Sequence, residues 1–590
     1  MKYYPKLSEL AATREMVDVF KGYNHNLRIG SGEFYDMKNL TSNDYPVLSP
    51  RPKRGIYLSS GTPQGMIAKD TLCYVDSGDF VIGGDRVPMG LTIERDSEGN
   101  IIPKTLISMG AYVIIMPDKK YINTSDLLDK GNIEASFTTT ETVTFLPCTL
   151  EGADLKVYIA DTAQKLAEFV NIKDQYDYCL DATVSPHVLK QYSTSSGSLE
   201  SVATTYIKIS SPGIGAHFEV YDGVKIEGIE NEKLSDLNNT MPIWAKGDDY
   251  IVVTSVPAAG ITQAAPITVT RQMPNMDFII ESENRLWGCR YGKALNGEVV
   301  NEIYASKLGD FKNWNCFMGV TTDSYAVTVG TDGAFTGAIA YLGYPLFFKE
   351  GCMHKVYGNY PSNYQITTTA CRGVQKGCSR SLAIVNETLL YKSRAAVCAY
   401  DGALPYEISA PLGEIKYSDA TAGAIGNKYY ISMLDDGGKY NLFVYDVLKG
   451  MWHREDNTRA LAFCNSGGDL YYIDVQNHIK SIRGTGTPES APIDWEATTG
   501  IIGTDSPDKK YISRLDVRMS LVPGARVYIY AQYDSVGAWE QLYASTGIAL
   551  RSFAVPIRPR RCDHLRLKIV GVGEAKIYSI CKTIEQGSDV

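Results

Sequence analysis

The stretch "NKYYISMLDDGGKYNLFVYD", residues 427–446, decides the predicted fold. An aromatic and apolar run leads into a tight polar turn, and a second aromatic run follows that turn. Runs of this kind on both sides of a short turn are typical of two paired antiparallel strands. The stretch therefore predicts a β-hairpin whose apolar faces are covered by other parts of the chain.

The same pattern recurs at nearly even spacing. Further copies are "NRLWGCRYG" (284–292), "YPLFFKEGCMHKVYG" (344–358), "ETLLYKSRAAVCAYDG" (387–402) and "GDLYYIDVQNHIKSI" (468–482). Their lead residues are Leu286, Leu346, Leu389, Tyr429 and Leu470, at steps of 60, 43, 40 and 41 residues. A four-stranded blade takes about 40 residues, and neighbouring blades must cover its two apolar faces. The repeat therefore predicts a β-propeller.

Two further copies precede these five. "KDTLCYVDSGDFVIGG" leads with Leu72, and "GAYVIIMPDKKYIN" leads with Tyr112, which is 40 residues later. From Tyr112 to Leu286 there are 174 residues, far more than one step needs. We therefore expect an all-β fold with a six- or seven-bladed propeller that is interrupted by a large insertion.

The chain is expected to have five parts: an N-terminal arm (1–60), a first group of blades (61–130), an inserted α+β or β interaction domain (131–270), a second group of blades (271–485) and a C-terminal β-sandwich (490–590). The arm is expected either to lie along a neighbouring surface or to close the propeller ring with a strand or two. "DTAQKLAEFVNI" (161–172) predicts a helix within the insertion. The alternation of apolar and polar residues in "SRLDVRMSL" and "ARVYIYAQY" predicts half-buried strands in the sandwich.

Composition agrees with this assignment. The chain has 590 residues with 40 Tyr and 53 Gly, which favours strands and turns. A net charge of −9 argues against a surface that wraps nucleic acid. No apolar run is long enough to span a membrane, and "MKYYPKLSELAATREM" does not look like a signal peptide. The 12 Cys form no C-x-x-C pair, so we expect reduced and mostly buried thiols in a protein made in a cytoplasm.

We predict no catalytic residue, no metal site and no cofactor site. The histidines do not show metal-ligand spacing; they are His25, His187, His217, His354, His453, His478 and His564. "SKLGDFKNW" (306–314) resembles a sialidase box, but its Asp310 follows the glycine and no second copy exists. Asp401, Asp446 and Asp474 lie at the ends of predicted blade strands, where they either face one another as a glycoside hydrolase requires or cap turns. We favour turn caps.

Two basic clusters and one set of aromatic residues are further candidates. The basic clusters are Arg51, Lys53 and Arg54, and Arg558, Arg560 and Arg561. They could contact phosphate or an acidic partner, but edge-strand charge or a subunit-interface ion pair is the preferred interpretation. The aromatic residues beside the blade leads are expected to form blade-to-blade core; they are Trp287, Phe347, Tyr391, Tyr430 and Tyr472.

Three longer segments together suggest a family. They are "FKGYNHNLRIGSGEFYDMKNLTSNDYPVLSPRPKRG" (20–55), "RLWGCRYG" with "NEIYASKLGDFKNW" (285–292 and 301–314), and "KKYISRLDVRM" with "VYIYAQYDSVGAWEQL" (509–519 and 527–542). The chain thereby resembles virion proteins of tailed bacteriophages, above all the nozzle or packaged-DNA stabilisation proteins of short-tailed phages.

That resemblance implies a structural tail protein without catalytic residues. Six copies would form a ring below the portal and adaptor, retain packaged double-stranded DNA and later let it pass without sequence-specific binding. The protein would be assembled in the host cytoplasm and reside in the virion tail. One alternative is a tail-tip propeller that binds a host-surface glycan, and the other is a propeller glycoside hydrolase.

Overall fold

The computed structural model describes residues 12–184, 187–202, 205–255, 260–293, 297–504, 509–558 and 560–586. Strands make up most of these residues, and the one α-helix among them is short. The prediction of an all-β fold is confirmed. The chain divides into two compact units. The first unit contains the residues up to 105, residues 348–353 and the residues from 369 onward. The second unit contains residues 106–347 and 354–368.

Four-stranded antiparallel sheets, here called blade sheets, repeat along the first unit. In sequence order, three of them are β7 (Pro63–Ala68), β8 (Leu72–Asp76), β9 (Asp79–Ile82) and β10 (Asp85–Pro88); β36 (Ala383–Val385), β37 (Thr388–Lys392), β38 (Val397–Tyr400) and β39 (Tyr406–Glu407); and β40 (Tyr417–Ile425), β41 (Lys428–Asp435), β42 (Tyr440–Asp446) and β43 (Met451–Arg454). The hairpin predicted from residues 427–446 is the β41–β42 pair.

The last blade sheet combines strands from both ends of the chain. β44 (Ala460–Ser466), β45 (Asp469–Asp474) and β46 (Ile479–Ser481) are followed in the sheet by β6 (Gly55–Leu58) and β47 (Thr487–Pro488). A Cβ atom at Gly55 would lie 2.1 Å from the Thr485 carbonyl oxygen, so a side chain at this position would force the strands apart. The N-terminal segment thus supplies the strand that completes this sheet.

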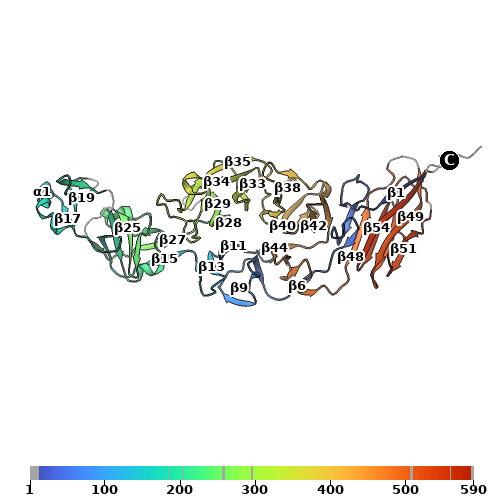
Figure 1. The fold of residues 1–590 in the computed structure, drawn as a ribbon, viewed down its shortest axis with the longest axis horizontal. Helices are drawn as coiled ribbons and strands as arrows, with labels where there is room; N and C mark the ends of the chain where they lie inside the picture. The colour runs from blue at the N-terminus through green and yellow to red at the C-terminus, as the bar shows by residue number, and fades with distance from the viewer. Residues whose placement is uncertain are drawn as a thin grey trace, which may run out of the picture. The chain divides into compact units, whose positions relative to one another are not determined.

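Two further sheets of the first unit, here called the terminal sheets, contain the C-terminal strands of the chain. One contains β1 (Ala12–Val17), β54 (Ala575–Gln586), β49 (Lys510–Leu521) and β52 (Arg551–Val555). The other contains β2 (Gly22–Tyr23), β3 (Glu33–Lys38), β48 (Asp494–Thr499), β53 (Leu565–Val572), β50 (Arg526–Tyr533) and β51 (Glu540–Thr546), and it continues through β2 into β43. Figure 1 shows β49 and β54 as long paired strands. Buried and exposed residues alternate along β49 and β50, as the period-two pattern predicted.

The second unit contains blade sheets of the same design. They are β11 (Thr105–Met109), β12 (Tyr112–Met116), β13 (Lys120–Asn123) and β14 (Lys130–Asn132), and then β28 (Phe278–Ser282), β29 (Arg285–Lys293), β30 (Val299–Ala305) and β31 (Tyr325–Thr328). A further sheet of this kind consists of β32 (Phe335–Tyr341), β33 (Tyr344–Lys349), β34 (Cys352–Tyr357) and β35 (Gln365–Ala370).

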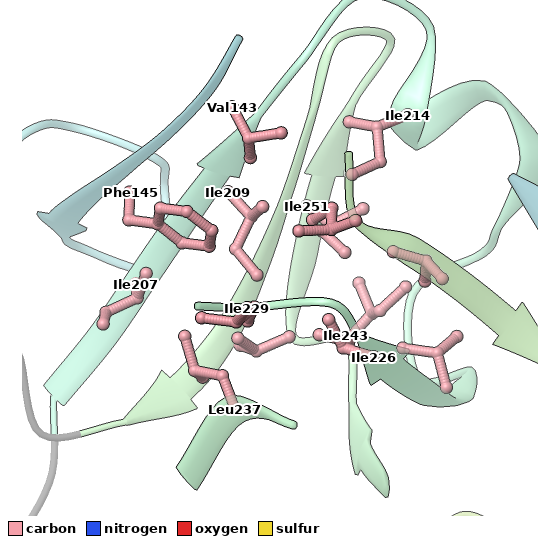
Figure 2. Packing of buried hydrophobic residues seen from close by; sticks show 14 of the residues in the cluster. Val143, Phe145, Ile207, Ile209, Ile214, Ile226, Ile229, Leu237, Ile243 and Ile251 are labelled. Carbon is pink, nitrogen blue, oxygen red and sulfur yellow. The ribbon is translucent and has the colours of Figure 1, made fainter. Parts of the chain in front are cut away.

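Residues 135–271 of the second unit form three sheets of a different kind. Their strands are β15 (Ala135–Thr138), β27 (Thr268–Arg271), β22 (Gly223–Glu227) and β23 (Thr240–Pro242); β24 (Ala245–Gly247), β25 (Tyr250–Ser255), β21 (Thr205–Ser210), β16 (Val143–Cys148) and β26 (Ile261–Gln263); and β17 (Val157–Ala160), β18 (Tyr178–Asp181), β19 (Val188–Ser193) and β20 (Ser198–Ser201). The first two sheets enclose a core of isoleucine, valine, leucine and phenylalanine, shown in Figure 2.

The predicted helix is α1 (Ala163–Ile172). Thr162 caps it, since its side chain accepts a hydrogen bond from the Lys165 amide at 3.3 Å. Phe169 is the buried residue on its inner face and packs against Tyr158 and Cys179 of the neighbouring strands. Short 3-10 helices occur at Lys173–Gln175, Ile214–His217, Glu232–Leu237, Pro361–Asn363, Ser379–Ser381 and Ala410–Leu412.

The aromatic residues beside the blade leads are buried between blade sheets. Tyr430 and Tyr472 share one core cluster, and Trp287 and Phe347 share another. Tyr391 is 0% exposed and contacts the ring of Phe348. Their prediction as blade-to-blade core is confirmed. Nine of the twelve cysteine thiols are buried, as expected. In the described part of the chain, no helix has the length and apolar character needed to cross a membrane.

The core in Figure 2 yields a stability prediction. Ile209 is fully buried in it, so Ile209→Ala should lower the free energy of unfolding of this region by about 2–5 kcal/mol through lost burial and a cavity. Ile209→Val should cost only about 0.5–1.5 kcal/mol, because most of the side chain remains. Hydrogen exchange of amides in residues 143–253 checks both values. Equal protection in the two variants would contradict the assignment of Ile209 to this core.

Candidate functional site

A polar cavity of about 310 Å³ opens beside β41 in the first unit. Its volume lies at the lower end of the range for small-molecule pockets. The N-terminal segment forms one wall, and residues from the ends of β41, β42, β43 and β46 form the rest. The cavity, here called the charged pocket, is lined by Ser42, Asn43, Arg51, Pro52, Arg54, Ile425, Gly426, Asn427, Lys428, Tyr430, Asp446, Glu455, Ile482 and Arg483.

Backbone hydrogen bonds hold the N-terminal wall in place. The short strands β4 (Leu40–Thr41) and β5 (Ser49–Pro50) pair with each other, and they bring residues 39 and 51 close together. The Arg51 amide donates to the Asn39 carbonyl at 2.8 Å, and the Asn39 amide donates to the Glu455 carbonyl at 2.6 Å. These backbone hydrogen bonds alone therefore fix the wall to the end of β43.

Buried ion pairs connect this wall to the blade sheets. The Arg54 guanidinium lies 2.6 Å from Glu455 and 2.9 Å from Asp456, and the side chains of Arg54 and Glu455 are each 3% exposed. Arg51 lies 3.0 Å from Glu489. Arg54 also donates to the Tyr472 hydroxyl at 3.2 Å. Opposite charges this close offset the cost of removing the guanidinium groups from water.

Not every hydrogen-bond donor of the pocket takes part in these ion pairs. Arg54 Nε is buried and has no hydrogen-bond partner among the described residues. Lys428 Nζ donates to Thr41 Oγ1 at 2.9 Å and to Asn43 Oδ1 at 2.6 Å, which are both neutral. Neither Lys428 nor Arg483 lies within ion-pair distance of a carboxylate in the described part of the chain. Lys428 and Arg483 therefore give the pocket two cationic side chains that hold no direct ion pair with any residue that the structure describes.

Burial affects the titration of two groups here. Burial lowers the pKa of the Lys428 ammonium, and the charges of Glu455 and Asp446 oppose this effect only in part. For Asp456, burial favours the protonated form, but Arg54 and Arg51 outweigh it and the pKa is lowered. Asp456 is consequently an ionised partner of the arginines at neutral pH.

The two basic clusters have different surroundings. Arg51 and Arg54 are buried in ion pairs within one chain, so neither phosphate contact nor a subunit interface accounts for them. Lys53, between them, is exposed. Arg558, Arg560 and Arg561 are exposed on the loop before β53, and the Arg560 guanidinium lies 5.3 Å from the centre of the Tyr533 ring.

The aspartates predicted as turn caps do cap turns. Asp401 accepts from the Ala403 amide, Asp446 from the Lys449 amide, and Asp474 from the Gln476 and His478 amides. Asp310 accepts from the Lys312 amide. Asp446 differs from the others because it also lines the charged pocket, where Ser42 Oγ donates to it at 2.6 Å.

None of the histidines lines the charged pocket. Burial lowers the pKa of His453 to about 3, so this side chain is neutral at pH 7. His354 is buried between Thr331 and Thr368. Within the described ranges, no group of three or more His, Cys, Asp or Glu residues is arranged to hold a metal ion.

Sequence reasoning missed Lys428, Arg483, Ser42 and Asn43 as pocket residues. Lys428 lies inside the very stretch that predicted the fold, but it reads there as an ordinary polar residue at a strand start. Its partners are almost four hundred residues away in the sequence. No sequence pattern links positions so far apart, so only the pairing of distant segments could reveal the pocket.

No family model matches this chain, and no curated protein matches it. Among solved structures, it matches an exo-β-1,3-galactanase from Phanerochaete chrysosporium in complex with galactose (10% identity, 52% of this chain, 94% of that chain, TM-score 0.20). It also matches a glycoside hydrolase family 43 arabinoxylan arabinofuranohydrolase from Bacillus subtilis (8% identity, 53% and 95% coverage, TM-score 0.16) and BamB from Moraxella catarrhalis (8% identity, 66% and 96% coverage, TM-score 0.22).

These matches contradict two predictions. The predicted function as a phage tail nozzle is corrected, because glycoside hydrolases and BamB are found in its place. The prediction that the chain is not an enzyme is contradicted by the same glycoside hydrolases. At these TM-scores no residue, substrate or activity is carried over to this chain. The expected hexamer, its portal, adaptor and DNA partners, and its virion location remain predictions.

The ion pairs of the pocket wall can be tested through stability. Arg54→Ala leaves Glu455 and Asp456 without their closest cation, so the free energy of unfolding of this region should fall by about 3–5 kcal/mol. The neighbouring, exposed Lys53→Ala should stay within about 0.5 kcal/mol of the natural protein. Chemical denaturation at pH 7 measures both.

The difference in the free energy of unfolding between Arg54→Ala and the natural protein should depend on pH. Because the pKa of Asp456 is lower in the folded than in the unfolded state, its stabilising contribution is present above the unfolded pKa of about 3.9 and is lost as the pH falls through the folded value. The deficit of Arg54→Ala should therefore shrink in acid. A deficit that is the same at pH 7 and in strong acid would argue against the ion pair as its cause.

Proposed function

We propose that the charged pocket binds a small anion through a phosphate or carboxylate group. The observation that carries this proposal is a buried donor without a hydrogen-bond partner within the described ranges, Arg54 Nε, in a pocket that is also lined by two cations without an ion pair there, Lys428 and Arg483. Anions that accept hydrogen bonds from charged donors bind with roughly twice the strength of neutral contacts. An anion in the pocket would satisfy the buried Arg54 Nε and neutralise Lys428.

The other lining groups favour a ligand that also carries hydroxyl groups. Asn43 and Asn427 contribute side-chain amides, and Ser42 and Asp446 contribute oxygen atoms. The Tyr430 phenol lines the same cavity, and burial keeps it protonated by raising its pKa. Such groups exchange hydrogen bonds with hydroxyls while the cations hold the charge.

The blade sheets support a propeller as the scaffold of this pocket. We infer seven blades from seven antiparallel units. Five are four-stranded sheets, one is the β40–β43 part of a ten-stranded sheet, and the last is the five-stranded sheet that contains β44, β45, β46, β6 and β47. Six was the other number that the repeat allowed. β6 would complete the last blade, since it pairs with β46 in the register Lys480 to Ile56.

Anion binding is tested by titration calorimetry of the full chain with inorganic phosphate and with acetate in low-chloride buffer. Arg483→Ala removes an exposed cation that holds no ion pair, so it should weaken binding about 10- to 100-fold without loss of stability. Lys428→Ala should weaken it at least as much. The control is Lys439→Ala, at the exposed turn after β41. If Arg483→Ala and Lys439→Ala bind like the natural protein, the proposal fails.

Glycoside hydrolysis is a second candidate function for the same pocket. The observation in its favour is that two buried carboxylates, Asp446 and Glu455, line one cavity. Hydrolysis of a glycosidic bond needs one protonated and one ionised carboxyl group. The two carboxyl groups have different surroundings, because Glu455 contacts the Arg54 guanidinium at 2.6 Å and Asp446 accepts from the Ser42 hydroxyl at 2.6 Å.

This second candidate predicts hydrolysis of at least one aryl glycoside. Asp446→Asn and Glu455→Gln should each lower kcat by about 100-fold or more, because each removes a carboxyl group that the reaction needs. Asp401→Asn is the matched control, since Asp401 caps a turn and does not line the pocket. A panel of nitrophenyl glycosides that stays intact would exclude this function and leave anion binding unaffected.

A further inference from the structure

A serine, a histidine and an aspartate meet beside one of the terminal sheets, away from the charged pocket in the sequence. Ser535 Oγ lies 2.8 Å from His564 Nε2, and His564 Nδ1 lies 2.8 Å from Asp563 Oδ2. Both ring nitrogens of the histidine are thus engaged, one by a hydroxyl and one by a carboxylate. This is the order of contacts that activates a serine nucleophile.

The paired strands β50 and β53 bring the two segments together. β50 ends at Tyr533, which pairs with Leu565 at the start of β53. The turn after β50 and the loop before β53 therefore lie at the same end of the two paired strands. Ser535 is the second residue of that turn, and Asp563 and His564 are the last two residues of that loop.

Backbone contacts lock the two loops to each other. The Asp534 amide donates to the His564 carbonyl at 2.9 Å, and Asp534 Oδ1 accepts from the Asp563 amide at 2.7 Å and from the His564 amide at 3.3 Å. Asp534 and Ser535 both have positive φ, at 53° and 52°. Both residues therefore lie in the left-handed region of a tight turn, which residues other than glycine adopt rarely.

The charges favour the required tautomer. The Asp563 carboxylate can only accept, so Nδ1 carries the proton and Nε2 of a neutral ring is left as the acceptor for the Ser535 hydroxyl. The hydrogen bond with His564 also lowers the pKa of Asp563, which keeps the carboxylate ionised. The Ser535 side chain is exposed, and the His564 side chain is 21% exposed, so both can be reached from solvent.

We propose that Ser535, His564 and Asp563 form a hydrolytic site for carboxylic esters. Ser535 Oγ forms a bond to the acyl carbon while His564 Nε2 takes the hydroxyl proton. The bond between the acyl carbon and the alcohol oxygen then breaks, and the same proton passes to the leaving alcohol. Water attacks the acyl-enzyme, gives its proton to Nε2, and the serine leaves with that proton. The products are a carboxylic acid and an alcohol.

The first test is covalent labelling of the full chain with a fluorophosphonate probe, followed by peptide mapping. The probe should attach to Ser535, and His564→Gln should slow labelling by about 100-fold, because the general base is lost. Asp563→Asn should slow it less. Ser196 is the matched control: it is an exposed turn serine whose hydroxyl lies 2.6 Å from Glu200 in place of a histidine. Ser196→Ala should leave labelling unchanged.

The second test is hydrolysis of p-nitrophenyl acetate by the same variants. Ser535→Ala should reduce the rate to that of free histidine in solution, while its thermal unfolding midpoint stays that of the natural protein because the side chain is exposed. Labelling that misses Ser535, or a rate that is the same in His564→Gln and the natural protein, would overturn the proposal. Neither result depends on anion binding in the charged pocket.

Discussion

The buried ion pairs of Arg51 and Arg54 are the interaction on which the arrangement of the first unit depends. Removing a charged group from water costs several kcal/mol, and only a close opposite charge with further hydrogen bonds offsets that cost. Glu455 and Asp456, which are adjacent, and Glu489 supply this charge from two places that are far from the arginines in the sequence. The N-terminal segment can therefore bury these two arginines at low cost in free energy only when the blade sheets are formed.

This constraint also explains why a pocket exists beside the ion pairs. The two arginines and their carboxylates neutralise one another, and their rigid planes fix the wall between β41 and the N-terminal segment. Lys428 and Arg483 face the same space without such partners. The proposed anion site and the proposed ester-hydrolysing site share one principle. In both, a rigid sheet brings loops from distant parts of the chain together and holds their side chains in fixed directions.

The segments that resemble phage tail proteins have a structural role in this chain. Residues 20–55 supply β2 to β6, residues 285–314 supply β29, β30 and the loop after them, and residues 509–542 supply β49, β50 and the turn at Ser535. Most of their distinctive residues are strand and turn formers that pack or pair. Similarity of this kind reflects what sheets require and does not specify what a site binds. The predicted nozzle function rested on such similarity.

Particular residues show how much of the fold and of the pocket could be predicted from the sequence. Tyr430, Tyr472 and Trp287 could be assigned to the core, because an aromatic residue beside a strand lead at a repeat of about 40 residues has to pack against the next sheet. Helix α1 was predictable from its local period and cap. Arg54 was visible as a basic residue, but its burial was not, since burial depends on Glu455 and Asp456, and Glu455 lies 401 residues further along the chain.

The sequence by itself determined the strands, their turns, the repeat and the alternation of buried and exposed residues along β49 and β50, because these depend on neighbours a few residues apart. Only the tertiary structure decided that β6 completes the last blade sheet, that Lys428 faces Asn43, and that Ser535 meets His564. Those contacts join positions separated by up to several hundred residues, and they follow from sheet register and charge burial, which no local pattern encodes.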